Sequence, residues 1–136
     1  MKIVVRIRSL AVVGAVAAFV ASSLATPAQA LDSRCTLDGY VPWTDGVYVK
    51  TQTVLTCTAT VGEKVGAQNQ RLGVVWGNLG SMVYSPASAG STYIASPVAS
   101  YNCNGTGTKT YRGKRWARST DNSERTTYSG GAALTC

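Results

Sequence analysis

The chain has 136 residues, of which 45% are hydrophobic and 14% charged, with 13 Lys and Arg, 6 Asp and Glu, and no histidine. The absence of histidine excludes Ser–His–Asp and Cys–His catalysis, histidine acid–base chemistry and histidine metal ligands. The length predicts a single domain.

The N-terminal segment is typical of a secretory signal peptide, residues 1–30. Three basic residues precede an uncharged apolar run, residues 10–20, which is shorter than the roughly 20 residues needed to span a bilayer. Ala28 and Ala30 supply the small residues that signal peptidase accommodates. We therefore expect a secreted, extracellular mature chain of residues 31–136, forming one β domain with no membrane contact after cleavage.

The charge must be corrected for the leader. Cleavage of the leader would remove three of the thirteen basic residues, so the mature chain would keep ten basic and six acidic residues, a net charge of +4. This mild excess is compatible with acidic partners or an anionic envelope surface, and it is far from that of a polycation. A nucleic-acid partner is therefore not expected.

All four cysteines follow the leader, and an even number in an exported chain predicts two disulfides. Three pairings are possible. We favour Cys35–Cys57 with Cys103–Cys136, because sequential pairing links residues within each half of the chain and fixes a C-terminus that ends on cysteine. The four cysteines include no Cys-x-x-Cys pair, which disfavours zinc, and no cofactor or metal is expected.

The mature sequence is rich in Gly, Thr and Ser, and its aromatic residues are all Tyr or Trp. No stretch repeats apolar residues at helical spacing over three turns, so the predicted fold is all-β. The clearest alternation of apolar and polar residues covers 47–61. Further strands are predicted at 72–76, 81–84, 92–103, 108–119 and 126–136.

Six or seven short strands predict a small disulfide-linked antiparallel β-sandwich, with an Ig-like form or a small barrel as alternatives. Asp38-Gly39 is expected to form a tight turn. Asn104-Gly105 is expected to form a hairpin that pairs the strand ending at Cys103 with the strand beginning at Thr108. A second turn at 121–123 would complete a three-stranded C-terminal meander.

The most distinctive stretch is Lys109–Arg118, in which five of ten residues are basic and two are aromatic. Guanidinium groups and flat rings together bind carboxylates, phosphates, sugars or protein hot spots. The predicted binding residues are Tyr111, Arg112, Lys114, Arg115, Trp116 and Arg118. The alternative interpretation is an edge strand whose charges prevent aggregation, with Trp116 in the core. Gly113 suggests a bulge that would turn consecutive charges outward.

A second cluster contains Tyr40, Trp43 and Tyr48. These residues are interpreted either as core or, together with Trp116, as a platform for sugars. The carboxylates have turn or loop positions that account for them, so a two-carboxylate hydrolase is the least favoured function and no catalytic residue is predicted.

In layout the chain resembles small secreted actinobacterial β-domain proteins with four cysteines, here Cys35, Cys57, Cys103 and Cys136. One such group is the adaptor subunit of umbrella toxin particles, and another is the subtilisin-inhibitor family. The resemblance to the adaptor implies a non-catalytic domain whose strand edges accept a partner segment. The inhibitor family is less similar, because no exposed reactive loop lies between closely spaced cysteines.

The first expected function is a secreted protein-interaction module or adaptor of an extracellular assembly, with a protein partner. The first alternative is a carbohydrate or cell-wall binding module. The second alternative is an inhibitor of an extracellular peptidase.

Overall fold

The computed structural model describes residues 30–86 and 96–136. The predicted signal peptide, except Ala30, lies outside these residues, as do 87–95, which include the first four residues of the strand expected at 92–103. None of the described residues forms a helix long and apolar enough to cross a bilayer.

The described residues form nine strands in two antiparallel sheets. The four-stranded sheet contains β1 (Cys35–Gly39), β2 (Trp43–Asp45), β3 (Tyr48–Cys57) and β6 (Val98–Asn102). The five-stranded sheet contains β4 (Gly62–Leu72), β5 (Trp76–Pro86), β7 (Thr108–Ser119), β8 (Glu124–Tyr128) and β9 (Ala132–Thr135).

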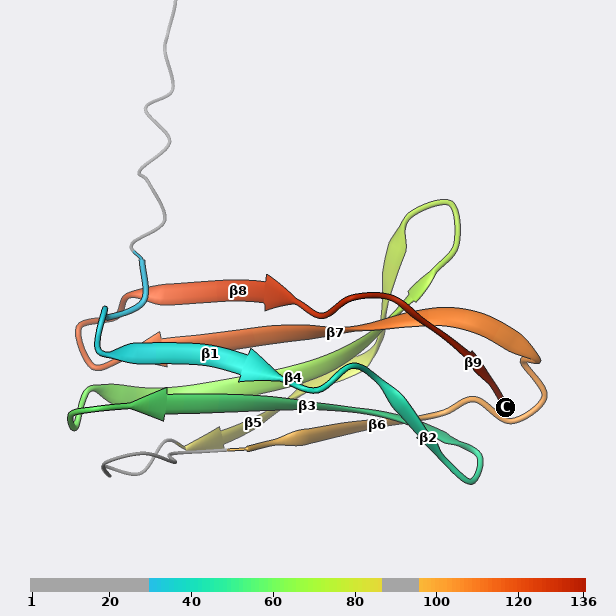
Figure 1. Cartoon of the computed structure of the whole chain (residues 1–136), viewed down its shortest axis with the longest axis horizontal. Coiled ribbons are helices and arrows are strands. Elements are labelled where there is room, and N and C mark those ends of the chain that lie inside the picture. Colours follow the sequence, from blue (N-terminus) through green and yellow to red (C-terminus); the bar gives the residue numbers. More distant parts are fainter. Residues whose placement is uncertain (1–29, 87–95) are drawn as a thin grey trace, which may run out of the picture.

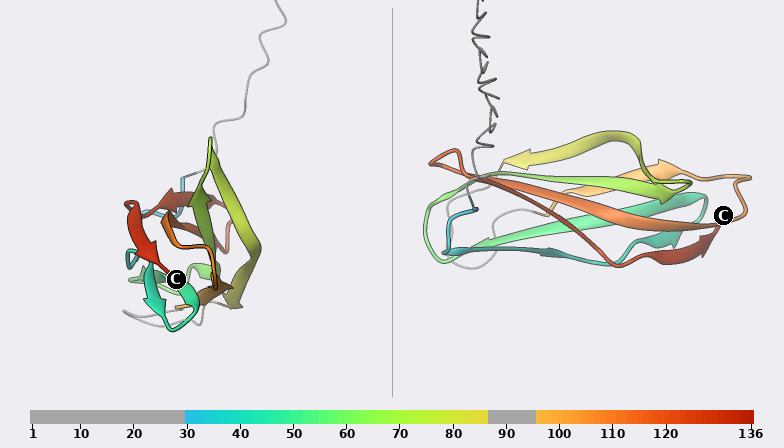
Figure 2. Two further views of the ribbon diagram at one scale, coloured as in Figure 1. Left: turned by 90° about the vertical axis from the view of Figure 1, so that its right-hand side faces the viewer. Right: turned by 90° about the horizontal axis from the view of Figure 1, so that it is seen from above.

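Each sheet is organised around one long strand. In the four-stranded sheet β3 pairs with β6 on one side, and β1 and β2 pair with its two halves on the other. In the five-stranded sheet β7 pairs with β4 on one side and with β8 and β9 on the other, and β5 lies beyond β4. The sheets face each other as two layers (Figures 1 and 2). The predicted β-sandwich is confirmed.

From Tyr48 in β3 and from Thr110 in β7, buried residues alternate with more exposed ones, as expected when one face of a strand packs on a second sheet. The core contains two apolar clusters. One cluster surrounds the Cys35–Cys57 disulfide and includes Leu55, and the other surrounds Cys103 and includes Tyr111. Both predicted disulfides are confirmed, with Cα–Cα distances of 4.1 Å and 5.7 Å. Such bonds are compatible with an extracellular location.

A polar layer separates the two apolar clusters. Asn69 of β4 donates from Nδ2 to the carbonyl oxygens of Val49 (3.2 Å) and Ala99 (3.1 Å) in the opposite sheet. Nearby, Gly113 lies so close to Thr51 that a Cβ at position 113 would overlap the Thr51 hydroxyl. Gly113 therefore permits the two central strands to approach, and β4 and β7 show no register shift there. The predicted bulge at Gly113 is wrong.

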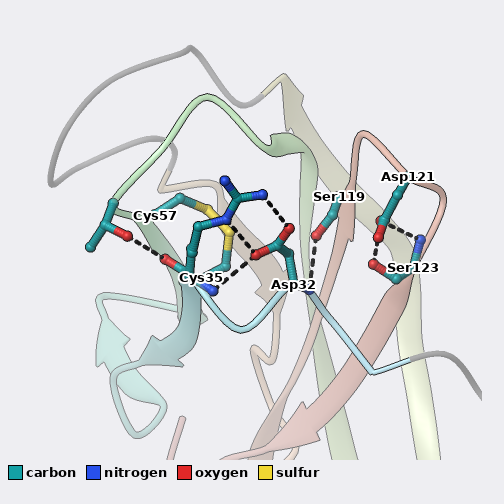
Figure 3. Close-up of polar contacts among 8 residues, drawn as sticks. Asp32, Cys35, Cys57, Ser119, Asp121 and Ser123 are labelled. Atoms are coloured by element: carbon teal, nitrogen blue, oxygen red, sulfur yellow. Dashed lines mark hydrogen bonds and ion pairs between the residues drawn. A yellow bond between two sulfur atoms is a disulfide. The ribbon is translucent and has the colours of Figure 1, made fainter.

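The first described residues are fixed at one end of the sandwich (Figure 3). The backbone N–H of Asp32 donates to Ser119 Oγ at 3.2 Å, and the Arg34 side chain donates to both carboxylate oxygens of Asp32 at 3.0 and 2.9 Å. These hydrogen bonds from Arg34 lower the pKa of Asp32 from 3.8 to about 2. The carboxylate therefore remains ionised in all but strongly acidic solution.

Three local predictions differ from the structure. Asp38-Gly39 ends β1 rather than forming a tight turn. The Asn104-Gly105 turn connects β6 to β7, but the two strands belong to different sheets, so the predicted hairpin and three-stranded meander are wrong. The segment 126–136 is interrupted between β8 and β9, and both strands pair with β7.

The turn at 121–123 is confirmed, since it joins the paired strands β7 and β8. The backbone N–H of Ser123 donates to Asp121 Oδ1 at 3.0 Å, and the Ser123 hydroxyl donates to the same oxygen (Figure 3). The two hydrogen bonds lower the pKa of Asp121.

Strand β4 is absent from the sequence prediction, which instead placed a strand at 72–76. That segment contains the last residue of β4, the β4–β5 turn and the first residue of β5. The β4 residues Gln68, Asn69 and Gln70 are at most 7% exposed. Neighbouring groups accept or donate hydrogen bonds at each of these amides, so a strand of polar composition can occupy a central position.

Candidate binding surface

The predicted basic stretch coincides with β7, which lies in the interior of the five-stranded sheet. The edge-strand alternative is therefore wrong. Because side chains alternate along a strand, the six predicted binding residues divide between two faces. Arg112, Lys114, Trp116 and Arg118 are partly exposed on the outer face, whereas Tyr111 and Arg115 are buried on the inner face.

The two inward residues have structural contacts. Tyr111 is fully buried, and its hydroxyl hydrogen-bonds Thr106 Oγ1 at 3.2 Å. Arg115 Nη2 donates to the Gly39 carbonyl at 2.8 Å and Nη1 lies 3.6 Å from an oxygen of Asp38, so it connects β7 to β1. Neither residue belongs to the outward surface.

The outward residues of β7 meet aromatic and basic side chains from three neighbouring strands. We call this surface the cation–aromatic face, and its members are Lys64, Trp76, Tyr84, Arg112, Lys114, Trp116, Arg118 and Tyr128. The sequence prediction did not include Lys64, Trp76, Tyr84 or Tyr128. These four residues come beside β7 through strand register, which the local sequence does not specify.

One end of the face is formed around Arg112. Its guanidinium carbon lies 4.4 Å from the Trp76 ring centroid and 4.0 Å from the Tyr128 ring centroid. Arg112 Nε donates to Gln70 Oε1 at 2.7 Å, and Gln70 in turn donates to Asn78 Oδ1 at 2.7 Å. We call Trp76, Arg112 and Tyr128 the Arg112 clamp. Two aromatic rings and a hydrogen bond restrict this side chain, which pre-organises its charge.

The other end of the face is formed around Trp116. Its ring packs edge-on against Tyr84 at a centroid distance of 5.4 Å, and the Lys64 ammonium lies 4.3 Å from the Tyr84 ring. A Cβ at Gly66 would lie within 3.0 Å of both Met82 and Tyr84, so the missing side chain gives the aromatic ring room. Glycine within a strand often marks a site where another group approaches the backbone closely.

Charge is distributed unevenly over this face. At the Trp116 end, Arg118 forms two hydrogen bonds with Glu63, which raise the Arg118 pKa, and Glu124 accepts from Trp116 Nε1 at 3.4 Å. At the Arg112 end, no described carboxylate pairs with Arg112 or Lys114. Positive charge therefore remains uncompensated at the clamp.

The second predicted cluster lies in the other sheet. Tyr40, Val41, Trp43 and Gln52 line a shallow hollow of about 390 Å³, and the Tyr40 side chain is well exposed. Trp116 belongs to the five-stranded sheet, so a single platform of Tyr40, Trp43 and Trp116 does not form. Tyr48 is exposed in β3, beside the Asp45–Lys50 ion pair. Core packing of this cluster is therefore not observed.

The described part of the chain contains no group of three or more His, Cys, Asp or Glu residues placed to hold a metal ion. The fold and this surface together define a disulfide-linked, two-sheet β-sandwich with a cationic and aromatic outer face. Comparison of the chain with known proteins finds no matching family model, no matching curated protein and no matching solved structure.

Proposed function

We propose that the protein is a secreted, non-catalytic interaction module that binds a protein partner through the cation–aromatic face. The observation that carries the proposal is the Arg112 clamp, a partly exposed arginine between two aromatic rings next to uncompensated charge. Arginine, tryptophan and tyrosine are the residues enriched at protein hot spots. An extended sheet face is also large enough to meet a protein surface.

Reversal of the free charges is expected to abolish partner capture. The exported protein carrying Arg112→Glu and Lys114→Glu would be tagged, recovered from the culture fluid of its natural host, and compared with the unaltered protein by mass spectrometry of co-purifying chains. The matched control is Lys109→Glu with Arg125→Glu, which makes the same change in net charge. Arg125 pairs with Ala117, which faces inward, so Arg125 lies off the cation–aromatic face. The side chains of Lys109 and Arg125 are both exposed.

Capture by the control but not by the clamp variant would support the proposal. Equal capture by all three proteins would contradict it, provided circular dichroism shows that each is folded. Two different partners in stoichiometric amounts would favour an adaptor, and a single peptidase would favour an inhibitor.

A saccharide is a second candidate ligand, at the hollow lined by Tyr40 and Trp43. Shallow aromatic hollows with polar groups at their rim suit the apolar faces of sugar rings. Retention on insoluble cell wall, competed by soluble sugar, is expected to fall at least tenfold in Tyr40→Ala. Equal retention of Tyr40→Ala and of a Tyr128→Ala control would exclude this hollow as the saccharide site.

A further inference from the structure

We infer that the Arg112 clamp and the adjoining β4–β5 turn bind an acidic peptide segment of the partner, with a carboxylate at Arg112 and an apolar side chain at the turn. The inference rests on the proposed function, because it names the chemistry of the partner that the cation–aromatic face would bind. It depends on three observations: the restricted guanidinium, the local charge and the exposed turn.

The guanidinium is prepared to receive a carboxylate. The Arg112 Nε–H donates to Gln70 Oε1, and the guanidinium carbon lies within 4.4 Å of the centroids of both rings. Among the described residues, none accepts a hydrogen bond from the two terminal nitrogens. A carboxylate can accept two parallel hydrogen bonds from an arginine, and a side chain already held in place loses little entropy on binding.

The distribution of charge favours an isolated carboxylate over a polyanion. A nucleic acid, an anionic wall polymer or an anionic membrane would extend along the face and meet Glu63 and Glu124 at its far end. Among the described residues of the face, Arg112 and Lys114 at one end have no carboxylate partner, whereas at the other end Arg118 is paired with Glu63 and Lys64 lies over Tyr84. A short acidic segment that ends at this position would avoid the repulsion.

The β4–β5 turn adds an apolar contact next to the clamp. It extends from the body of the sandwich (Figure 1), and at its tip Val74 is wholly exposed and Val75 is 73% exposed. Trp76 follows directly and pairs across the hairpin with Leu72, which is also exposed. Aliphatic side chains in water beside an arginine–aromatic cluster suit a peptide with an apolar residue near its carboxylate.

The experiment uses two synthetic peptides and the protein exported from the full-length chain. The peptides are acetyl-Leu-Glu-Leu-Glu-amide and the same sequence with glutamine in place of glutamate. Nuclear magnetic resonance would follow the Arg112 Nε–H and the indole N–H groups of Trp76 and Trp43 during titration. We expect saturable shifts at Arg112 and Trp76 with the glutamate peptide, no shift at Trp43, and at least tenfold weaker binding of the glutamine peptide.

Arg112→Lys keeps the charge but removes the planar fork, so it is expected to weaken binding of the glutamate peptide about tenfold or more. Arg125→Lys is the matched control and should bind as the unaltered protein does. Val74→Ser with Val75→Ser is expected to weaken binding through loss of the apolar contact, without affecting the clamp resonances of the free protein.

Equal affinity in Arg112→Lys and the unaltered protein would overturn the inference. So would stronger shifts of the same resonances by polyphosphate or by vesicles of anionic phospholipid, since these would identify a polyanion or membrane surface. If the charge-reversed protein loses its natural partner while the peptide result is negative, the proposed function stands and the acidic-peptide inference falls. If partner capture is unchanged, the proposed function itself falls.

Discussion

Gly113→Ala is expected to lower the free energy of unfolding by about 3 kcal/mol, an effect of the size seen when a packed core is overfilled. The added Cβ would overlap the Thr51 hydroxyl and lie 3.3 Å from Thr51 Cβ, where the centres of the two sheets meet. Both residues belong to central strands, so neither backbone can move without disturbing its neighbours. Urea denaturation followed by circular dichroism would measure the change.

The matched control is Gly77→Ala in β5. The nearest atom to a Cβ there is the Arg71 carbonyl oxygen at 3.9 Å, so we expect a change within about 0.5 kcal/mol.

A double variant tests whether the contact with Thr51 is the cause. Thr51→Ala removes a buried hydroxyl that has no hydrogen-bond partner among the described residues, so by itself it should cost little. Combined with Gly113→Ala it should recover more than half of the loss. Purely additive effects of the two substitutions would show that the sheets do not meet at this point.

Removal of the disulfides is expected to have the second large effect. Replacing both cysteines of either pair by alanine should cost about 3–4 kcal/mol, because the bonds close loops with sequence separations of 22 and 33 residues. A domain of this size has a total stability of roughly 5–15 kcal/mol. Loss of both bonds, about 7 kcal/mol, would therefore remove a large part of that stability and should lower the urea midpoint of unfolding markedly.

Urea midpoints of the two double-alanine proteins and of the quadruple-alanine protein would measure these contributions. Reduced unaltered protein provides the control, since it should unfold at about the same midpoint as the quadruple variant. An unchanged midpoint after complete reduction would show that the two apolar clusters hold the sandwich together without the covalent links.

The alternation of apolar and polar residues along the chain was sufficient to locate β3, because every second residue of that strand faces the opposite sheet. No such alternation marks β7, since its inward face carries Arg115 and its outward face carries Trp116, and its bounds were predicted from the flanking turn signals. The predicted bounds of β7 match the observed strand. The disulfide pairing that the sequence favoured among three possibilities is the one observed.

Strand β4 could not be predicted in the same way. Its buried residues include two glutamines and an asparagine, which local propensity assigns to loops. They are buried because hydrogen-bond partners come from β3, β5, β6 and β7. Only the assembled sandwich supplies those partners.

The change of sheet between β6 and β7 also could not be predicted from the local sequence. Asn104-Gly105 favours a turn, and Gly105 has the positive φ of 75° that such a turn uses. A local turn signal does not specify whether the next strand continues in the same sheet. Here β6 pairs with β3, and β7 pairs with β4.

The sequence by itself predicted the all-β class, the extent of β7 and the concentration of charge within it, and it favoured one of the three possible disulfide pairings. The tertiary structure alone decided which of those charges face solvent. One face of β7 packs against the four-stranded sheet, so alternation places Tyr111 and Arg115 inside and Arg112 outside. The tertiary structure placed β7 inside the five-stranded sheet, with its inner face against the four-stranded sheet, and it brought Trp76 and Tyr128 beside Arg112. Residues so distant in sequence come together through strand register, which no local pattern encodes.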